Sequence, residues 1–226
     1  MREKPILFNE PMVRAILHGK KHATRRPVIG KFDCRIRQFH HLEYCPDPRI
    51  GLQAYFQTED GERLDGIRAP FFPGDHLWVR ETWAANVPGC ETQGGYSYRV
   101  DHSGLNDGPY RIKWKPSIHM PRAASRLTLE ITKIEVERLQ NLTDEDAWDE
   151  GADELDGRFS DADICATAKK YGLMAEDVTT TFVHLWDGLY ARQGLGWAEN
   201  PWVWVVRFAV LRSEKKCCLI KKTLDL

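Results

Sequence analysis

The run from Pro201 to Leu211 constrains the fold of this chain more than any other segment. Its stretch from Trp202 to Val206 is the longest unbroken apolar run in the sequence, and apolar residues continue at most positions as far as Leu211. A strand without alternating polar positions must be covered on both faces. The run therefore predicts a buried strand near the end of the chain.

Local patterns predict three further helical or turn features. Pro11 precedes an apolar stripe that repeats at helical spacing and ends before Gly19, which predicts a short first helix with a glycine cap. Thr143 and Asp146 have the spacing of a capping box, so a helix is expected to begin there. A third helix fits the apolar face formed by Phe182, Leu185, Trp186 and Leu189.

Two more strands are expected between these helices. A turn at 73–75 leads into a segment in which Leu77 and Val79 alternate with polar neighbours. In the segment 126–136 the apolar positions change parity between Ile131 and Ile134, which predicts a bulge or a bend. Because strands and helices do not alternate regularly, the order favours an α+β fold over a doubly wound sheet.

The sequence predicts one domain over 1–212, with insertions near 30–72 and 84–111 and a tail at 213–226. The first insertion is rich in turn-forming residues and is expected to carry short hairpins. No apolar run approaches the roughly 20 residues of a membrane span, and no signal peptide precedes the first helix. We therefore expect a cytoplasmic protein with no membrane association.

The six cysteines form no CxxC pair, so reduced thiols are expected rather than a disulfide framework. His40, His41, Cys34 and Cys45 are close in sequence, but their spacing is irregular and we expect no metal there. We expect no cofactor.

Charge is segregated although the formal net charge is only −1. The segment from Arg2 to Arg37 holds ten Lys and Arg against three Asp and Glu, whereas 144–163 holds ten Asp and Glu against one Arg. Such a balance excludes a protein that coats nucleic acid through bulk charge. It leaves two interpretations open: a polyanion bound locally beside carboxylates, or two solvated faces.

The basic segment 19–26 contains a lysine and a threonine that are candidates for a catalytic role. Lys21 and Thr24 are three residues apart, so on a helical turn their side chains would lie on the same face. A lysine that is desolvated or crowded by Lys20, Arg25 and Arg26 loses its proton more readily and can act as a base or nucleophile. From spacing alone, a solvated basic loop after the helix cap is the favoured explanation of the segment.

The order of several motifs resembles the ASCH family, and the resemblance covers roughly 4–210. Gly19-x-Lys21-x-x-x-x-Arg26 after a short amphipathic helix looks like the family signature, and the turn at 73–75 before Leu77-Trp78-Val79-Arg80-Glu81 looks like its next marker. The chain further resembles phage and prophage members of the family. The segments that carry this second likeness are 114–122, 145–151 and 200–205.

This resemblance implies a PUA-like closed β-barrel with short flanking helices, a fold used to read RNA and modified bases. Small bacterial members hydrolyse the acyl amide of acetylated cytidine with a lysine, a threonine and a glutamate, and these roles are carried to Lys21, Thr24 and Glu150. The leading hypothesis is therefore an amidohydrolase acting on N-acylated cytidine-type nucleosides. Two alternatives stay open: a non-catalytic reader of RNA or DNA, and a ribonuclease that uses the same pocket.

The expected partner is a nucleoside or single-stranded nucleic acid, with RNA favoured over DNA. Cations and aromatic rings hold single strands by contacting phosphates and by stacking on bases. A structural role is the competing interpretation for several of these side chains, most clearly for the glutamate. The expected substrate-binding residues are Lys20, Arg25, Arg26, Arg80, Glu81, Trp83 and Lys115.

Overall fold

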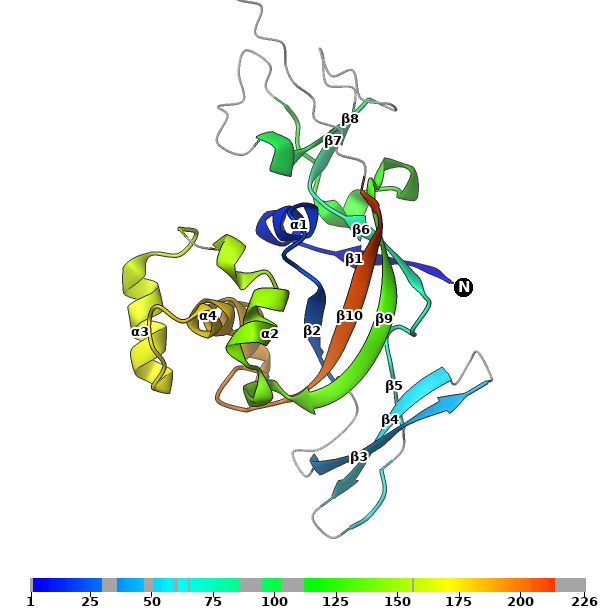
Figure 1. Ribbon diagram of the computed structural model, residues 1–226, viewed down its shortest axis with the longest axis vertical. Helices are drawn as coiled ribbons and strands as arrows, with labels where there is room; N and C mark the ends of the chain where they lie inside the picture. The colour runs from blue at the N-terminus through cyan, green and yellow to red at the C-terminus, as the bar shows by residue number, and fades with distance from the viewer. Residues whose placement is uncertain are drawn as a thin grey trace, which may run out of the picture.

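The computed structural model is an α+β structure built on one mixed sheet (Figure 1). The residues that it describes are 2–29, 36–46, 51–58, 61–64, 66–85, 95–102, 112–155 and 157–213. Cys34, most of the second insertion and all of the tail after Ser213 lie outside them.

Five strands form the main sheet, in the order β1-β6-β9-β10-β2. All neighbours are antiparallel except β1 and β6, which are parallel. The strands expected around Leu77 and Val203 therefore belong to the same sheet. The strand bounds are β1 Glu3–Leu7, β2 Ala23–Pro27, β6 His76–Arg80, β9 Leu127–Arg138 and β10 Trp202–Ser213.

The expected closed barrel is wrong, because this sheet is open. β1 and β2 are its two edges, and among the described residues no backbone ladder joins them. The chain leaves β1 at Leu7, forms helix α1 (Glu10–Leu17) and only then enters β2. A side chain bridges the edges instead: the Arg26 Nη2 atom donates a hydrogen bond to the Leu7 carbonyl at 3.2 Å.

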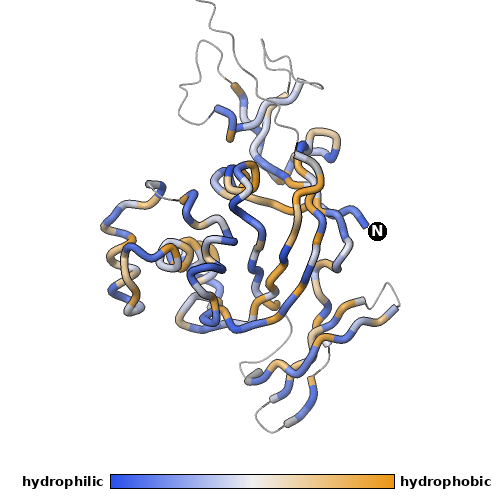
Figure 2. The backbone as a smooth tube through the Cα atoms, viewed as in Figure 1, coloured by the Kyte–Doolittle hydropathy of each residue, from blue (hydrophilic) through white to orange (hydrophobic). Residues whose placement is uncertain are grey.

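The buried terminal strand and its bend are confirmed. Val203, Trp204, Val205 and Val206 are each no more than 3% exposed, so β10 is covered on both faces. Apolar residues concentrate along the strands of this sheet in Figure 2. The register between β9 and β10 shifts at Thr132, between the two apolar positions whose parity had changed.

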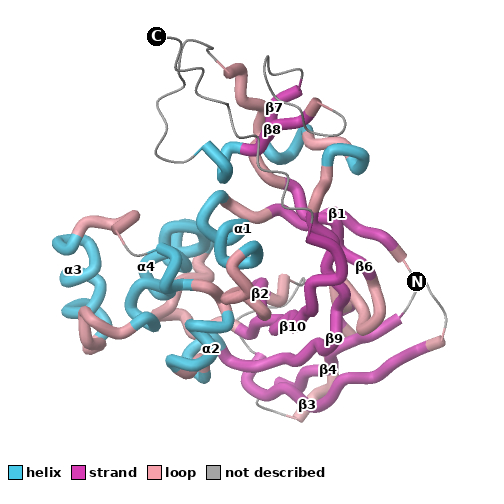
Figure 3. The backbone as a smooth tube through the Cα atoms, turned by 45° about the horizontal axis from the view of Figure 1, so that its top comes forward, coloured by secondary structure: helices cyan, strands magenta, loops and turns pink. Residues whose placement is uncertain are grey.

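Two smaller sheets flank the main one. The first insertion forms a three-stranded antiparallel sheet, β3 (Ile36–Cys45), β4 (Gly51–Thr58) and β5 (Ile67–Arg68), as its hairpin pattern predicted. It packs on the main sheet through Phe56, whose ring lies 5.6 Å from that of Trp202. β7 (Trp83–Ala85) pairs with β8 (Tyr96–Tyr98) at the opposite end of the molecule (Figures 1 and 3).

The remaining α-helices gather on one side of the sheet (Figure 3). They are α2 (Asp144–Asp149), α3 (Asp161–Tyr171) and α4 (Val178–Tyr190). The capping box of α2 and the apolar face of α4 are confirmed. The sequence did not predict α3. Short 3-10 helices occupy Arg99–His102, Ser117–His119, Arg122–Ala124, Leu139–Asn141, Ala152–Leu155 and Ala191–Gln193. Within the described ranges, no helix combines the length and apolarity needed to cross a membrane.

Candidate functional site

The basic segment forms an extended edge strand and not a helical turn. α1 ends at Leu17, Gly19 adopts a φ of +70°, and β2 begins at Ala23. Thr24 and Arg26 pair with Val206 and Trp204 of β10, which draws the segment into the sheet. The helical spacing proposed for Lys21 and Thr24 is therefore wrong, because pairing with an apolar strand overrides the local preference.

Lys21 and Glu150 form a buried ion pair although 129 residues separate them. The Lys21 ammonium donates to the Glu150 carboxylate at 2.8 Å and to the Glu150 carbonyl at 2.7 Å. The two side chains are 1% and 6% exposed. These two bonds use two of the three ammonium donors, and the described residues provide no acceptor for the third. One face of the ammonium is therefore available to a ligand.

The end of α2 positions this glutamate. The capping box at Thr143 fixes the start of the helix, and Glu150 forms its C-terminal cap. Gly151 then takes a φ of +72° and lets the chain pass directly over Lys21. A Cβ atom at Gly151 would lie 2.6 Å from that of Ala15 and 3.1 Å from that of Lys21. The glycine is required both for its conformation and for this close approach.

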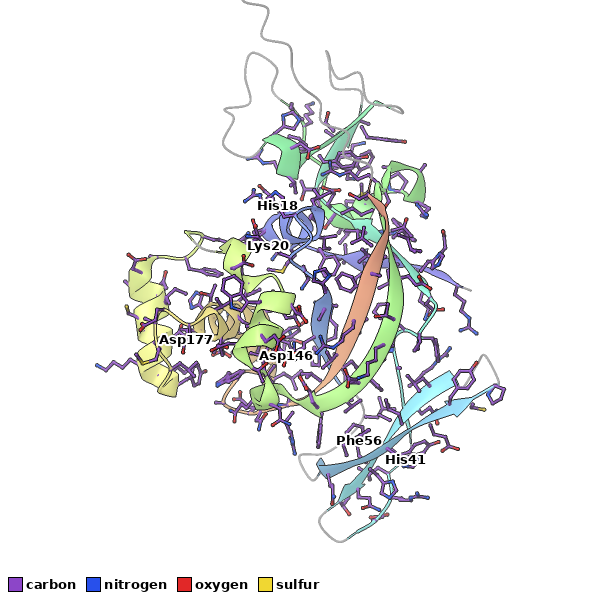
Figure 4. The ribbon with its side chains drawn as sticks, viewed as in Figure 1. His18, Lys20, His41, Phe56, Asp146 and Asp177 are labelled. Carbon is purple, nitrogen blue, oxygen red and sulfur yellow. The ribbon has the colours of Figure 1, made fainter. Side chains whose placement is uncertain are left out.

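Arg25 connects Glu150 to a set of carboxylates at the surface. Its guanidinium lies 3.5 Å from Glu150, 2.8 Å from Glu137 and 3.2 Å from Asp146. Asp146, labelled on α2 in Figure 4, also accepts a bond from Arg207 at 2.9 Å. Although burial opposes it, Arg25 together with bonds from Thr143 holds the pKa of Asp146 below its ordinary value.

Burial dominates the ionisation of Lys21. Removal from water lowers the pKa of this lysine, and the nearby Glu150 carboxylate only partly opposes that effect. The positive charges of Arg26 and Arg25 lower it further. The amine is therefore easier to deprotonate than an ordinary lysine, which suits a base or a nucleophile.

Lys21, Thr24 and Glu150 line one cavity of about 260 Å³. Their convergence agrees with the expectation from the motifs. Arg25 and Arg26 add two cationic groups to the same wall, so the lining carries three cations against one carboxylate. The cavity is bounded elsewhere by Leu7, Phe8, Asn9, Met12, Ser117, Phe182, Leu185, Trp186, Leu189 and Tyr190.

The sequence did not predict the aromatic and apolar walls. The Phe8 ring lies 5.4 Å from the Lys21 ammonium and 5.9 Å from the Arg26 guanidinium, which places it under both cations. The opposite wall comes from α4, where Trp186 is buried but Leu189 is 50% exposed. The apolar stripe of α4 was the available signal, but it predicted only a helix and not what the helix faces.

The other predicted binding residues divide into two groups. Lys20, labelled in Figure 4, is ion-paired with Asp153 at 2.7 Å and with Glu154 at 2.8 Å. Glu81 is 1% exposed and forms two 2.9 Å bonds with Arg126, so its carboxylate is occupied inside the protein. Like Arg25, these two side chains are therefore bonded to other residues of the same chain.

Arg80, Trp83 and Lys115 lie outside the cavity lining. Arg80 donates to the Ile118 carbonyl at 3.3 Å, and Ile118 follows Ser117, which does line the cavity. Lys115 lies 4.8 Å above the buried ring of Trp83. The structure thus places these three residues around the segment 115–118 at the edge of the cavity.

This arrangement can support hydrolysis of an acyl group. A buried amine, a carboxylate bonded to it, a hydroxyl and two guanidiniums surround a space that aromatic residues close on the other side. Such groups can activate a nucleophile, transfer a proton and stabilise a developing oxyanion.

Searches of family models, curated proteins and solved structures found no match to this chain.

Proposed function

We propose that the chain is an ASCH-type amidohydrolase that removes the acyl group from an N-acylated cytidine-type nucleoside. The observation that carries this proposal is the buried Lys21–Glu150 pair, which faces a cavity shared with Thr24. The motif resemblance supplies the substrate class. We also place the protein in the cytoplasm.

In the proposed reaction, the neutral amine of Lys21 accepts a proton from a water molecule that the Thr24 hydroxyl orients, and the water oxygen attacks the acyl carbon. Lys21 passes the proton to the Glu150 carboxylate, to which it is bonded. The C–N bond then breaks as Glu150 delivers this proton to the departing exocyclic nitrogen, which regenerates the neutral amine and the carboxylate. The products are a carboxylic acid and the free nucleoside. Arg26 stabilises the oxyanion, because its guanidinium lines the cavity and no carboxylate lies within ion-pair distance of it in the described structure.

The walls of the cavity suit a nucleobase. Phe8 and the α4 residues Trp186 and Tyr190 offer aromatic surfaces, and the excess of cations favours an electron-rich heterocycle with exposed carbonyl oxygens. A cavity of about 260 Å³ is of the size expected for one small ligand.

Release of acetate from N4-acetylcytidine tests the proposal. The wild type should turn the nucleoside over, and Lys21→Ala should lose at least about a hundredfold in kcat/KM. Lys20→Ala is the matched control: this neighbouring lysine is exposed and bound to Asp153 and Glu154, which lie outside the cavity lining, and its removal should leave turnover unchanged. Circular dichroism checks that each variant is folded.

Two results would favour the alternatives. A wild type that binds nucleic acid but never releases acetate would be a reader, in which Lys21 and Glu150 only shape the cavity. Cleavage of an RNA strand that depends on Lys21 would identify a ribonuclease. Lack of turnover, binding and cleavage would remove every version of this proposal.

A further inference from the structure

Arg25 lies in the wall of the cavity, but carboxylates of the protein surround its guanidinium. The side chain is 1% exposed, and its Nε atom donates to the Glu137 carboxylate at 2.9 Å. Its terminal nitrogens lie 3.2 Å from Asp146 and 3.5 Å from Glu150. Although burial opposes it, Glu150 and Glu137 hold the pKa of Arg25 above its ordinary value. The guanidinium is therefore always charged, and the protein itself neutralises that charge.

The main sheet fixes where this guanidinium lies. Arg25 pairs in register with Val205 of β10, and Val205 pairs with Glu135 of β9. Residues two apart along a strand point to the same face, so Glu137 shares a face with Glu135 and Arg25. The Arg25 side chain therefore crosses β10 to reach Glu137, on the side of the sheet where α2 lies (Figure 1).

Arg25 and Lys21 hold different oxygens of the Glu150 carboxylate. Oε1 lies 3.5 Å from the Arg25 Nη1 atom, whereas Oε2 accepts from the Lys21 ammonium at 2.8 Å. The last torsion of a glutamate side chain is soft, and a separate cation on each oxygen restricts it. A guanidinium donates hydrogen bonds and accepts none, so Oε2 is the oxygen that can exchange a proton with Lys21.

We propose that Arg25 is a positioning residue, which holds Oε2 of Glu150 toward Lys21, adds positive charge beside the amine and does not contact the substrate. This role differs from the substrate-binding role that the motif resemblance implied for Arg25. Its effect on turnover rests on the proposed function. Its effect on the ionisation of Lys21 rests only on the observed contacts and charges.

Steady-state hydrolysis of N4-acetylcytidine by Arg25→Met measures the effect on turnover. The kcat should fall about tenfold or more, because the Glu150 carboxylate is no longer held in line with the amine. KM should change by less than about twofold, since no contact with the substrate is lost. Burial lowers the pKa of Lys21 most and the charge of Arg25 lowers it further, so the acidic limb of kcat/KM should move to higher pH.

Arg207→Met is the matched control. Among the described residues, the carboxylate partners of Arg207 are Glu135, Asp146 and Asp149, and Arg207 lies outside the cavity lining. Its loss breaks ion pairs with α2 without touching Glu150, so kcat and the pH profile should not change. Arg25→Lys keeps the charge but not the planar fork, so it should restore the pH profile while kcat stays reduced.

NMR measures the ionisation of Lys21 without any turnover. The carbon chemical shift of its Cε atom, followed against pH with isotopically labelled lysine, should show a higher midpoint in Arg25→Met than in the wild type. Arg25→Lys and Arg207→Met should keep the wild-type midpoint. If Arg25→Met does not fold, the double variant Arg25→Met/Glu137→Gln replaces it, because it also removes a carboxylate that has lost its partner.

Two results would overturn the inference. An unchanged Lys21 midpoint together with an unchanged kcat would mean that Arg25 serves only the stability of the fold. A raised KM with an unchanged kcat would mean that Arg25 binds the substrate. A wild type that does not hydrolyse N4-acetylcytidine, but whose Lys21 midpoint depends on Arg25 as described, would overturn only the proposed hydrolysis and support the positioning role.

Discussion

Replacing Glu150 with glutamine tests whether the buried ion pair has the energetic role that its geometry indicates. The substitution preserves shape but removes the charge that lies 2.8 Å from Lys21 and 3.5 Å from Arg25. Breaking a buried pair by neutralising one partner costs about 3–5 kcal/mol, because the other charge stays buried. We expect about 3 kcal/mol, since the amide oxygen and the Glu150 carbonyl still accept from Lys21.

The cost should depend on pH in a defined direction. Glu150 raises the pKa of Lys21 against the effect of burial, so its removal lowers that pKa further. A lysine with a lowered pKa destabilises the fold while it is protonated, and stability rises with pH until the unfolded chain also loses the proton, near pH 10.5. The deficit of Glu150→Gln should therefore be largest near neutrality and shrink as pH rises toward 10.

Urea unfolding at pH 7 and at pH 9.5 measures the loss of unfolding free energy in Glu150→Gln and its change with pH. Thermal unfolding should show a fall in Tm of about 10 °C. Glu137→Gln is the matched control, because it also removes an ion-pair partner of Arg25. The Glu137 side chain is 26% exposed, whereas Glu150 is buried. That change should cost less than about 1 kcal/mol. A Glu150→Gln deficit no larger than that of the control, or one that grows with pH, would refute the reasoning.

Three further perturbations test the surroundings of the site. Gly151→Ala should destabilise the fold by about 2 kcal/mol or more and reduce turnover, because the added Cβ atom would meet Ala15 and Lys21. Gly19 has a similar φ but no atom within 4 Å of an added Cβ, so Gly19→Ala should cost only about 1 kcal/mol. Equal losses of the two variants in urea unfolding would contradict this. Asp146→Asn should cost about 1–2 kcal/mol at pH 7 through the lost cap and ion pairs. Because the pKa of Asp146 in the fold lies below its ordinary value of 3.8, the difference should shrink as pH falls through that lowered pKa, and a pH-independent difference would count against it. Glu81→Gln should lower the free energy of unfolding by about 3 kcal/mol, because it leaves the buried Arg126 with Asp101 as its one remaining ion-pair partner among the described residues. A loss under about 1 kcal/mol would contradict that role.

Elements with a strong local signal were predictable from the sequence. The cap at Thr143, the stripe of α1 and the bulge near Thr132 each depend on neighbours within a few positions. α3 was missed because it buries little more than Thr167 and Ala168, so no apolar stripe marks it.

Features that depend on distant contacts were not predictable in this way. Whether β1 and β2 pair depends on the path of the chain through α1, which connects them. The periodicity of the sequence gives no information on that path. The contact between Lys21 and Glu150 joins positions 129 residues apart, and it was anticipated only through the motif resemblance. A helix stripe such as that of α4 has the same pattern whether it faces core or cavity, so the stripe did not reveal the cavity wall.

A crystal structure of the wild type soaked with cytidine, the product of the proposed reaction, tests the central claim most directly. The account predicts that the base lies in the cavity between Phe8 and α4, with its exocyclic nitrogen within about 4 Å of the Lys21 amine, close to reacting distance. Cytidine bound elsewhere, or turned so that its ribose faces Lys21 and its exocyclic nitrogen faces solvent, would contradict the account.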